Sequence, residues 1–179
     1  MAYELIGRDD IYRGKVFGVS LSRFQSKSKG EVGIEIVHHN GGAGALPVFE
    51  DGTIALVRQW RYPLGRYSLE ISAGRIETGQ SPEETARREL EEEMGLRATE
   101  MRKLGEFFVA PGWCEEKIHV YLARGLEAST QNLDDDEEIE VVRLNFADAL
   151  GRVRSGEIDD AKSIVTLLFA APLLGQSVA

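Results

Sequence analysis

Cysteine is almost absent from this 179-residue sequence, which contains only Cys114. One cysteine cannot form an internal disulfide framework or a multi-cysteine zinc site. No apolar run approaches the roughly 20 residues that span a bilayer. The first residues, MAYELIGRDD, lack the basic and then apolar layout of a signal peptide. We therefore expect a cytoplasmic protein with no membrane partner.

A basic surface is also lacking. The chain has 21 Lys and Arg residues against 30 Asp and Glu residues, a formal net charge of −9. A general nucleic-acid binder depends on a basic footprint, so we expect no nucleic-acid partner. The acidity does not exclude a phosphate-bearing substrate, because divalent cations can lie between an acidic site and anionic phosphates.

The first sixty residues have the composition of β-strands. KVFGVSLSRF and EVGIEIVHHN are rich in β-branched and aromatic residues, and the polar turn QSKSKG between them predicts a hairpin. GALPVF and TIALVRQW flank the turn signal Glu50-Asp51-Gly52, which predicts a second hairpin. We expect residues 1–45 to form an N-terminal element of antiparallel strands and residues 46–179 to form the main domain.

The clearest helix follows a short strand near residues 67–71. Ser81 is a good N-cap, Pro82 suits the first helical position and Glu84 completes a capping box. The helix is predicted to run to Met94 and to stop at Gly95. Further strands are expected at 104–110, 117–126 and 139–145, and further helices at 146–154 and 161–174. This irregular mixture predicts an α+β fold, a mixed α/β/α sandwich rather than a doubly wound sheet.

The predicted helix has an apolar face and an acidic face. Ala86, Leu90 and Met94 fall in one arc and are expected to pack on a sheet. Three carboxylates converge on another arc: Glu89, Glu92 and Glu93. Like charges at these spacings repel, so hard cations between them would account for the arrangement. The alternative is a plain solvated acidic face, which we expect for Glu84 and Glu91.

Residues 74–96, GRIETGQSPEETARRELEEEMGL, resemble the Nudix box, GX5EX7REUXEEXGU, in which U is aliphatic. The matching positions are Gly74, Arg88-Glu89-Leu90, Glu92-Glu93, Gly95 and Leu96. One position departs from the pattern, because Gln80 stands where the family has Glu and supplies no charge to a metal cluster. Glu77 is the nearby carboxylate that could compensate.

The resemblance covers nearly the whole chain and implies a Nudix-type α/β/α sandwich. LVRQWRYPLGRYSLEISAG is similar to the segment before the box in ADP-ribose pyrophosphatases. Pro111, 15 residues beyond Leu96, stands where that subfamily carries a proline. Family members that cleave GDP-mannose share much of this layout, so both substrates stay open.

The resemblance also implies roles for individual residues. The metal, Mg²⁺ with Mn²⁺ as a substitute, would be bound by the Ala73 carbonyl, Glu89, Glu92 and Glu93. The catalytic residues would be Glu92, Arg88, which holds the carboxylates by ion pairing, and Glu137, the general base, with Glu138 as the alternative. Substrate binding is expected from Arg61, Glu70, Arg75 and Glu116. The segment around the base, LDDDEEIEVV, includes Asp134 to Asp136, which we expect to be a solvated loop.

The expected reaction is hydrolysis of the pyrophosphate bond of ADP-ribose, giving AMP and ribose 5-phosphate. One alternative is hydrolysis of GDP-mannose or another nucleoside diphosphate sugar. Another is a Nudix domain that binds its nucleotide sugar without cutting it, which Gln80 would favour. The resemblance further implies a homodimer in which the N-terminal strands of one subunit help to form the other's site.

Overall fold

The computed structural model describes residues 3–133 and 137–177. The chain divides into two compact units, Met1–Gly41 with Phe107–Lys117, and Gly42–Glu106 with Ile118–Ala179. The division after Gly41 lies near the expected boundary at residue 45, but the first unit also takes in the segment 107–117.

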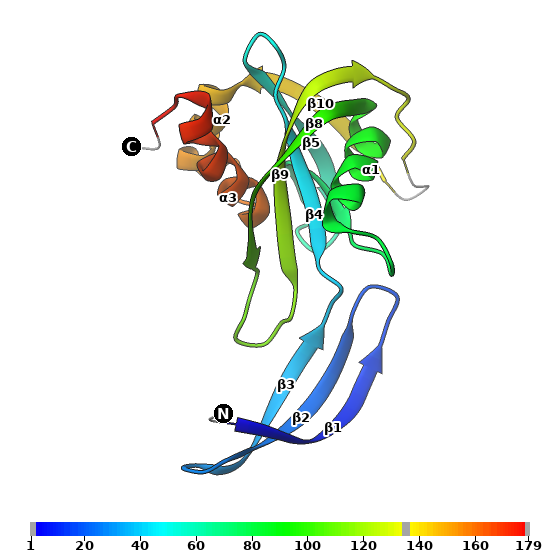
Figure 1. Ribbon diagram of the computed structural model, residues 1–179, viewed down its shortest axis with the longest axis vertical. Coiled ribbons are helices and arrows are strands. Elements are labelled where there is room, and N and C mark those ends of the chain that lie inside the picture. The colour runs from blue at the N-terminus through cyan, green and yellow to red at the C-terminus, as the bar shows by residue number, and fades with distance from the viewer. Residues whose placement is uncertain (1–2, 134–136, 178–179) are drawn as a thin grey trace. The chain divides into compact units, whose positions relative to one another are not determined.

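The first unit is built on a three-stranded antiparallel sheet (Figure 1). Its strands are β1 (Tyr3–Arg13), β2 (Gly18–Ser26) and β3 (Gly30–His38), in the order β1-β2-β3. The predicted hairpin between β2 and β3 is confirmed, with pairing from Gly18–His38 to Ser26–Gly30. Gly30 has a φ of 75° after the turn, a conformation that favours glycine.

The second unit contains a mixed four-stranded sheet in the order β7-β4-β9-β8. Its strands are β7 (Ser72–Arg75), β4 (Gly42–Pro47), β9 (Lys117–Ala128) and β8 (Leu96–Phe108). Strand β4 is antiparallel to β7 and parallel to β9, and all six of its residues are buried. Both edges of β4 are therefore occupied within this sheet.

A separate antiparallel sheet, β10-β5-β6, consists of β10 (Ile139–Asn145), β5 (Thr53–Arg61) and β6 (Arg66–Glu70). The second predicted hairpin is wrong beyond its turn, because the backbones of the two segments pair only through an isolated bridge between Val48 and Ile54. The Gly52 turn forms as expected, with its N–H donating to the Phe49 carbonyl at 3.0 Å. The strands then separate because β4 already pairs on both sides with β7 and β9.

The described residues of the second unit also form three α-helices: α1 (Pro82–Met94), α2 (Phe146–Ser155) and α3 (Ala161–Ala170). Figure 1 shows α1 on one side of the strands and α2 with α3 on the other, which confirms the predicted α/β/α layering. The expected helix 161–174 is α-helical only to Ala170 and continues as the 3₁₀ turn η1 (Ala171–Leu174). Pro172, which has no N–H to donate, accounts for the change.

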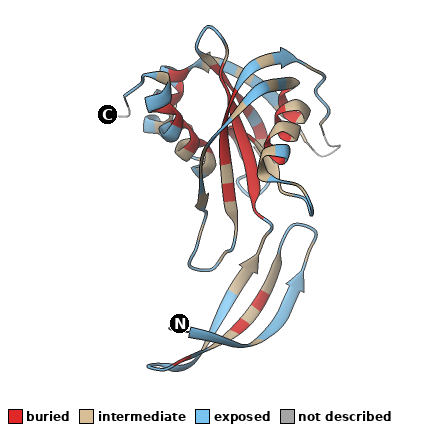
Figure 2. Ribbon diagram, viewed as in Figure 1, coloured by how far each residue is buried: buried red, intermediate tan, exposed pale blue. Residues whose placement is uncertain are grey.

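Helix α1 begins and ends as the sequence predicts. Ser81 and Glu84 form both hydrogen bonds of the capping box, and Gly95 has a left-handed φ of 62°. Its apolar face packs into the core on β4 and β5, where the buried residues include Ala43, Ala45, Val57, Ala86, Leu90 and Met94 (Figure 2). This packing fixes which side of α1 faces β7. Among the residues described, no helix is long and apolar enough to cross a membrane.

Candidate active site

Two carboxylates of α1 are buried against β7. Glu89 is 8% exposed and Glu93 is 2% exposed. The backbone N–H of Ala73 donates to Oε2 of Glu93 at 3.2 Å. A Cβ atom on Gly74 would lie 1.8 Å from Oε1 of Glu89, so only glycine leaves room for this carboxylate. Gly74 thus permits the close approach of the Glu89 carboxylate to the backbone of β7.

The electrostatics of this pair favour a bound cation. Burial and then the charge of Glu89 raise the pKa of Glu93 to about 8. Burial raises the pKa of Glu89 to about 7, against the opposing effect of Arg88 and with further contributions from Glu92 and Glu137. Buried like charges are costly unless an opposite charge compensates them. Carboxylate oxygens are the ligands that Mg²⁺ and Mn²⁺ prefer, so these residues fit a divalent metal.

The guanidinium of Arg88 contacts both Glu89 and Glu92. It lies 2.7 Å from Glu89 Oε1 and donates to Glu92 Oε2 at 2.7 Å. The side chain of Glu92 is 36% exposed, compared with 11% for that of Glu89. Within residues 3–133 and 137–177, no three acidic, histidine or cysteine side chains are gathered closely enough to bind one ion. The part of Glu92 as a metal ligand therefore stays a prediction.

Glu137 and Glu138 have different surroundings. The charge of Glu137 contributes to the raised pKa of both Glu89 and Glu93. Glu138 instead accepts a hydrogen bond from the hydroxyl of Tyr67 on β6. Of the two candidates for the general base, Glu137 is therefore the one that interacts with the buried carboxylates. Asp134, Asp135 and Asp136 lie outside the described residues.

Arg61 and Glu70, both expected to bind substrate, form an ion pair in which Glu70 is buried and Arg61 is partly exposed. Nε and Nη2 of Arg61 donate to the two oxygens of Glu70 at 2.8 and 2.5 Å. Lys162, at the start of α3, also donates to Glu70, and it lies 3.0 Å from Asp160. Sequence reasoning missed Lys162, because 92 residues separate it from Glu70 and only the fold brings them together. The charge of Glu93 contributes to the raised pKa of Arg61, which places this network in electrostatic reach of α1.

The other two candidate substrate residues lie in different units. Arg75 ends β7, and its carbonyl oxygen lies 3.5 Å from Nη2 of Arg88. Glu116 belongs to the first unit, where its carboxylate lies 3.6 Å from Nδ1 of His39. The substrate contacts of both residues stay predictions.

Gln80 has a local structural contact. Its side-chain oxygen accepts a hydrogen bond from the Thr85 hydroxyl at 3.1 Å, and its N–H donates to the Glu77 carbonyl at 3.0 Å. Thr85 is fully buried in the first turn of α1. The amide thus connects the loop before α1 to the helix, a role that needs an acceptor oxygen rather than a charge.

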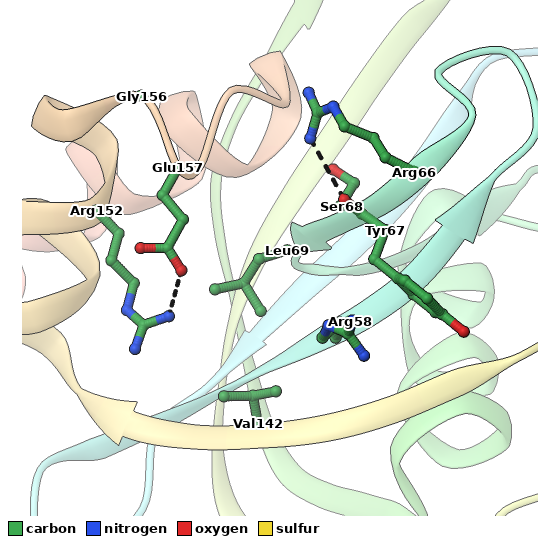
Figure 3. Close-up of a pocket in the computed structure, with 9 residues that line it drawn as sticks. All are labelled: Arg58, Arg66, Tyr67, Ser68, Leu69, Val142, Arg152, Gly156 and Glu157. Carbon is green, nitrogen blue, oxygen red and sulfur yellow. Dashed lines mark hydrogen bonds and ion pairs between the residues drawn. The ribbon is translucent and has the colours of Figure 1, made fainter.

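A hollow lined by the sheet β10-β5-β6 and by the end of α2 contains three arginines but has little excess positive charge (Figure 3). Arg152 pairs with Glu157 at 2.6 Å, Arg66 pairs with Asp159, and Arg58 lies 3.3 Å from Glu140. Each guanidinium is therefore matched by a carboxylate, which disfavours this hollow as a second phosphate site.

Glu70→Gln is expected to lower the free energy of unfolding by about 3 kcal/mol, because it leaves Arg61 and Lys162 without their buried anion. Arg61 and Lys162 hold the pKa of Glu70 at about 2 despite its burial, against an ordinary value of 4.5. This contribution is fully present above pH 4.5 and is lost as the pH falls toward 2. The free energy of unfolding of the variant should therefore fall less than that of the wild type as the pH is lowered below 4.5.

The measurement is urea unfolding of both proteins between pH 3 and pH 7. Glu157→Gln is the matched control, since its ion pair with Arg152 is exposed and should be worth under about 1 kcal/mol. A Glu70→Gln variant as stable as the control at pH 7 would show that the buried network contributes little.

Comparison with known proteins agrees with this geometry. A family model described as the NUDIX domain matches residues 38–167. An ADP-ribose pyrophosphatase of Bacillus subtilis is 38% identical over 92% of this chain and 90% of its own length. A GDP-mannose pyrophosphatase of Yersinia enterocolitica is 34% identical over 76% of this chain and 77% of its own.

A solved structure described as an ADP compounds hydrolase has the same fold. It matches with a TM-score of 0.85 at 22% identity, over 98% of this chain and 95% of that one. Nudix hydrolases generally need a divalent metal ion. On the matched residues and the similarity over most of its length, the chain belongs to the Nudix hydrolase family.

Proposed function

We propose that the protein hydrolyses the pyrophosphate bond of ADP-ribose in the presence of Mg²⁺, giving AMP and ribose 5-phosphate. The observation that carries the proposal is the buried carboxylate pair Glu89 and Glu93, which interacts with Glu137. These two carboxylates lie on the helix that carries the Nudix-box residues. The choice of ADP-ribose is supported by the B. subtilis relative, which is named for that substrate.

Mg²⁺, with Mn²⁺ as a substitute, would be held by Glu89 and Glu93, assisted by Glu92 and the carbonyl of Ala73. When bound, such a metal neutralises the charge of the diphosphate and lowers the pKa of a water ligand. The described residues fit this role because two buried carboxylates need a compensating cation. Arg88 then fixes the orientation of Glu89 and Glu92 through its two ion pairs.

Glu137 is proposed as the general base that accepts a proton from the attacking water. A base must reach the reacting water, and only Glu137 of the two neighbouring glutamates interacts with Glu89 and Glu93. Glu138 is engaged by the Tyr67 hydroxyl. The hydroxide attacks one phosphorus, the bond from that phosphorus to the bridging oxygen breaks, and the second phosphate leaves on its own ester.

Arg61 is proposed to donate hydrogen bonds to the diphosphate, a task that suits a planar guanidinium. Both oxygens of Glu70 accept hydrogen bonds from Arg61 or Lys162, so we propose that Glu70 orients Arg61 instead of binding ribose. Arg75 and Glu116 are proposed as the remaining contacts with the substrate.

We also propose that the protein is a cytoplasmic homodimer formed through the N-terminal strands. The three-stranded sheet of the first unit exposes large apolar side chains, including Tyr3, Leu5, Ile6, Ile11, Tyr12, Phe17 and Ile34. Three strands need a buried apolar face to be stable, and exposed groups of such residues mark interaction surfaces. A second copy would cover them and add its strands to the substrate site.

The experiment is a comparison of kcat/KM for ADP-ribose, GDP-mannose, ADP-glucose and NADH with Mg²⁺, with products separated by chromatography. We expect ADP-ribose to be the best substrate and AMP to be the nucleotide product. GDP-mannose is the second candidate substrate because of the Y. enterocolitica relative. A higher kcat/KM for GDP-mannose than for ADP-ribose would make it the substrate in place of ADP-ribose. Binding of ADP-ribose without turnover of any compound would overturn the hydrolase proposal in favour of a nucleotide-sugar sensor, with Gln80 as its cause.

A further inference from the structure

The side chain of Tyr67 on β6 makes three contacts that hold it in one position. Its hydroxyl donates to Oε1 of Glu138. The guanidinium carbon of Arg58 lies 3.8 Å from the centre of its ring, and the Trp60 ring meets it edge-on at 5.2 Å. Figure 3 shows Arg58 and Tyr67 beside each other on the neighbouring strands β5 and β6. Tyr67 is therefore a fixed donor at the edge of the β10 segment.

Arg58, which lies against the ring of Tyr67, also contacts a second glutamate, Glu140. Its Nη1 atom lies 3.3 Å from Oε2 of Glu140, which pairs directly with Arg58 in the β10–β5 ladder. Glu138 immediately precedes β10, and exposure alternates along the segment, with Glu138 and Glu140 exposed and Ile139 half-buried between them, so the two glutamates lie on one side. Tyr67 and Arg58 thus hold two acidic side chains on the same side of the chain.

The opposite side of the segment faces α1. Ile139 packs against the core that contains Ala86 and Leu90 of α1. Extending the same alternation puts Glu137 on the side of Ile139. The interaction of Glu137 with Glu89 and Glu93 agrees with this placement. A one-residue change of orientation would direct Glu138 to α1 and Glu137 away from it.

We propose that Tyr67 is a positioning residue which, together with Arg58, holds Glu138 and Glu140 on the far face and thereby directs Glu137 toward α1. This inference rests on the proposed role of Glu137 as the general base. Without the hydroxyl, the residues before β10 would populate more than one orientation. The kcat would then fall in proportion to the population in which Glu137 faces α1.

The first experiment compares Tyr67→Phe with the wild type. The variant keeps the ring under Arg58 and against Trp60 and loses only the hydrogen bond to Glu138. We expect kcat for ADP-ribose to fall by about 5- to 10-fold, as for loss of one hydrogen bond to a charged group at an exposed site. KM and the thermal midpoint should change little, because neither the diphosphate contacts nor the core is altered.

The control is the same substitution in a Glu137→Gln background. If Tyr67 acts through Glu137, the double variant should be no slower than Glu137→Gln alone. A full 5- to 10-fold further loss in that background, or an unchanged kcat in Tyr67→Phe alone, would overturn the proposal. A wild-type rate in Glu137→Gln would instead show that the proposed base is wrong.

Hydrogen exchange gives a readout that does not depend on turnover. Amides in a peptide covering residues 137–140 should exchange faster in Tyr67→Phe than in the wild type, while those of α1 stay unchanged. This result is expected even if ADP-ribose is not the substrate, so the positioning role and the hydrolase function can fail separately. Equal exchange in both proteins would contradict the positioning role.

Discussion

Glu93→Gln is expected to lower kcat for ADP-ribose by more than about 100-fold, since even groups that only support a metal ligand cost 10- to 100-fold when removed. Glu93 is 2% exposed and lies against the backbone of Ala73, so no other side chain of α1 can take its place. The amide keeps the shape of the carboxylate but supplies no charge to a metal ion.

The same substitution should leave the metal-free protein at least as stable as the wild type. Buried like charges oppose folding, and Glu93 shares its surroundings with Glu89 and Glu137. A gain in stability with a loss of activity is the mark of a residue kept for function rather than for folding. A plain structural role predicts the opposite, a loss of both.

The measurement pairs steady-state kinetics in Mg²⁺ with thermal unfolding in EDTA. Glu83→Gln is the matched control on the same helix, because its ion pair with Arg87 is exposed and local. It should keep the wild-type rate and midpoint. Wild-type turnover in Glu93→Gln would remove this carboxylate from the metal site.

Glu137→Gln is expected to lower kcat by about 10²- to 10⁴-fold, the usual contribution of a general base. KM should change much less, because the base acts on the attacking water rather than on the bound diphosphate. The stability should also stay close to that of the wild type, since Glu137 lies outside the core formed around Ala86 and Leu90 and precedes the first residue of β10.

Glu138→Gln is the control for this prediction. Its amide oxygen can still accept the hydrogen bond from Tyr67, so we expect only a small loss of kcat. Single-turnover kinetics with ADP-ribose should show that the chemical step is slowed in Glu137→Gln alone. A larger loss in Glu138→Gln than in Glu137→Gln would exchange the roles of the two residues.

Local signals in the sequence were sufficient to locate α1, the helix that carries the proposed metal ligands. Ser81, Glu84 and Gly95 determine where α1 begins and ends, and the spacing of Ala86, Leu90 and Met94 determines which face is buried. Those two facts together place Glu89 and Glu93 against β7. Such features depend on neighbours within one or two helical turns, which a single sequence displays directly.

Features that depend on distant residues were not predictable in the same way. The turn at Gly52 is visible in the sequence, but the separation of β4 and β5 follows from the pairing of β4 with β9, about 75 residues later. Lys162 and Tyr67 carry no local signal of their contacts, because their partners Glu70 and Glu138 are reached only through the fold. The sequence likewise left Glu137 and Glu138 open, and the hydrogen bond from Tyr67 to Glu138, which only the fold brings about, distinguishes them.

The most direct test of the account is the release of AMP from ADP-ribose by the wild-type protein, followed by chromatography in Mg²⁺, in EDTA, and after Mg²⁺ is restored. The account predicts that AMP and ribose 5-phosphate are released in equal amounts with Mg²⁺. Their release should stop in EDTA and resume when the metal is restored. AMP release that continues unchanged in EDTA would contradict a metal-dependent reaction at Glu89 and Glu93.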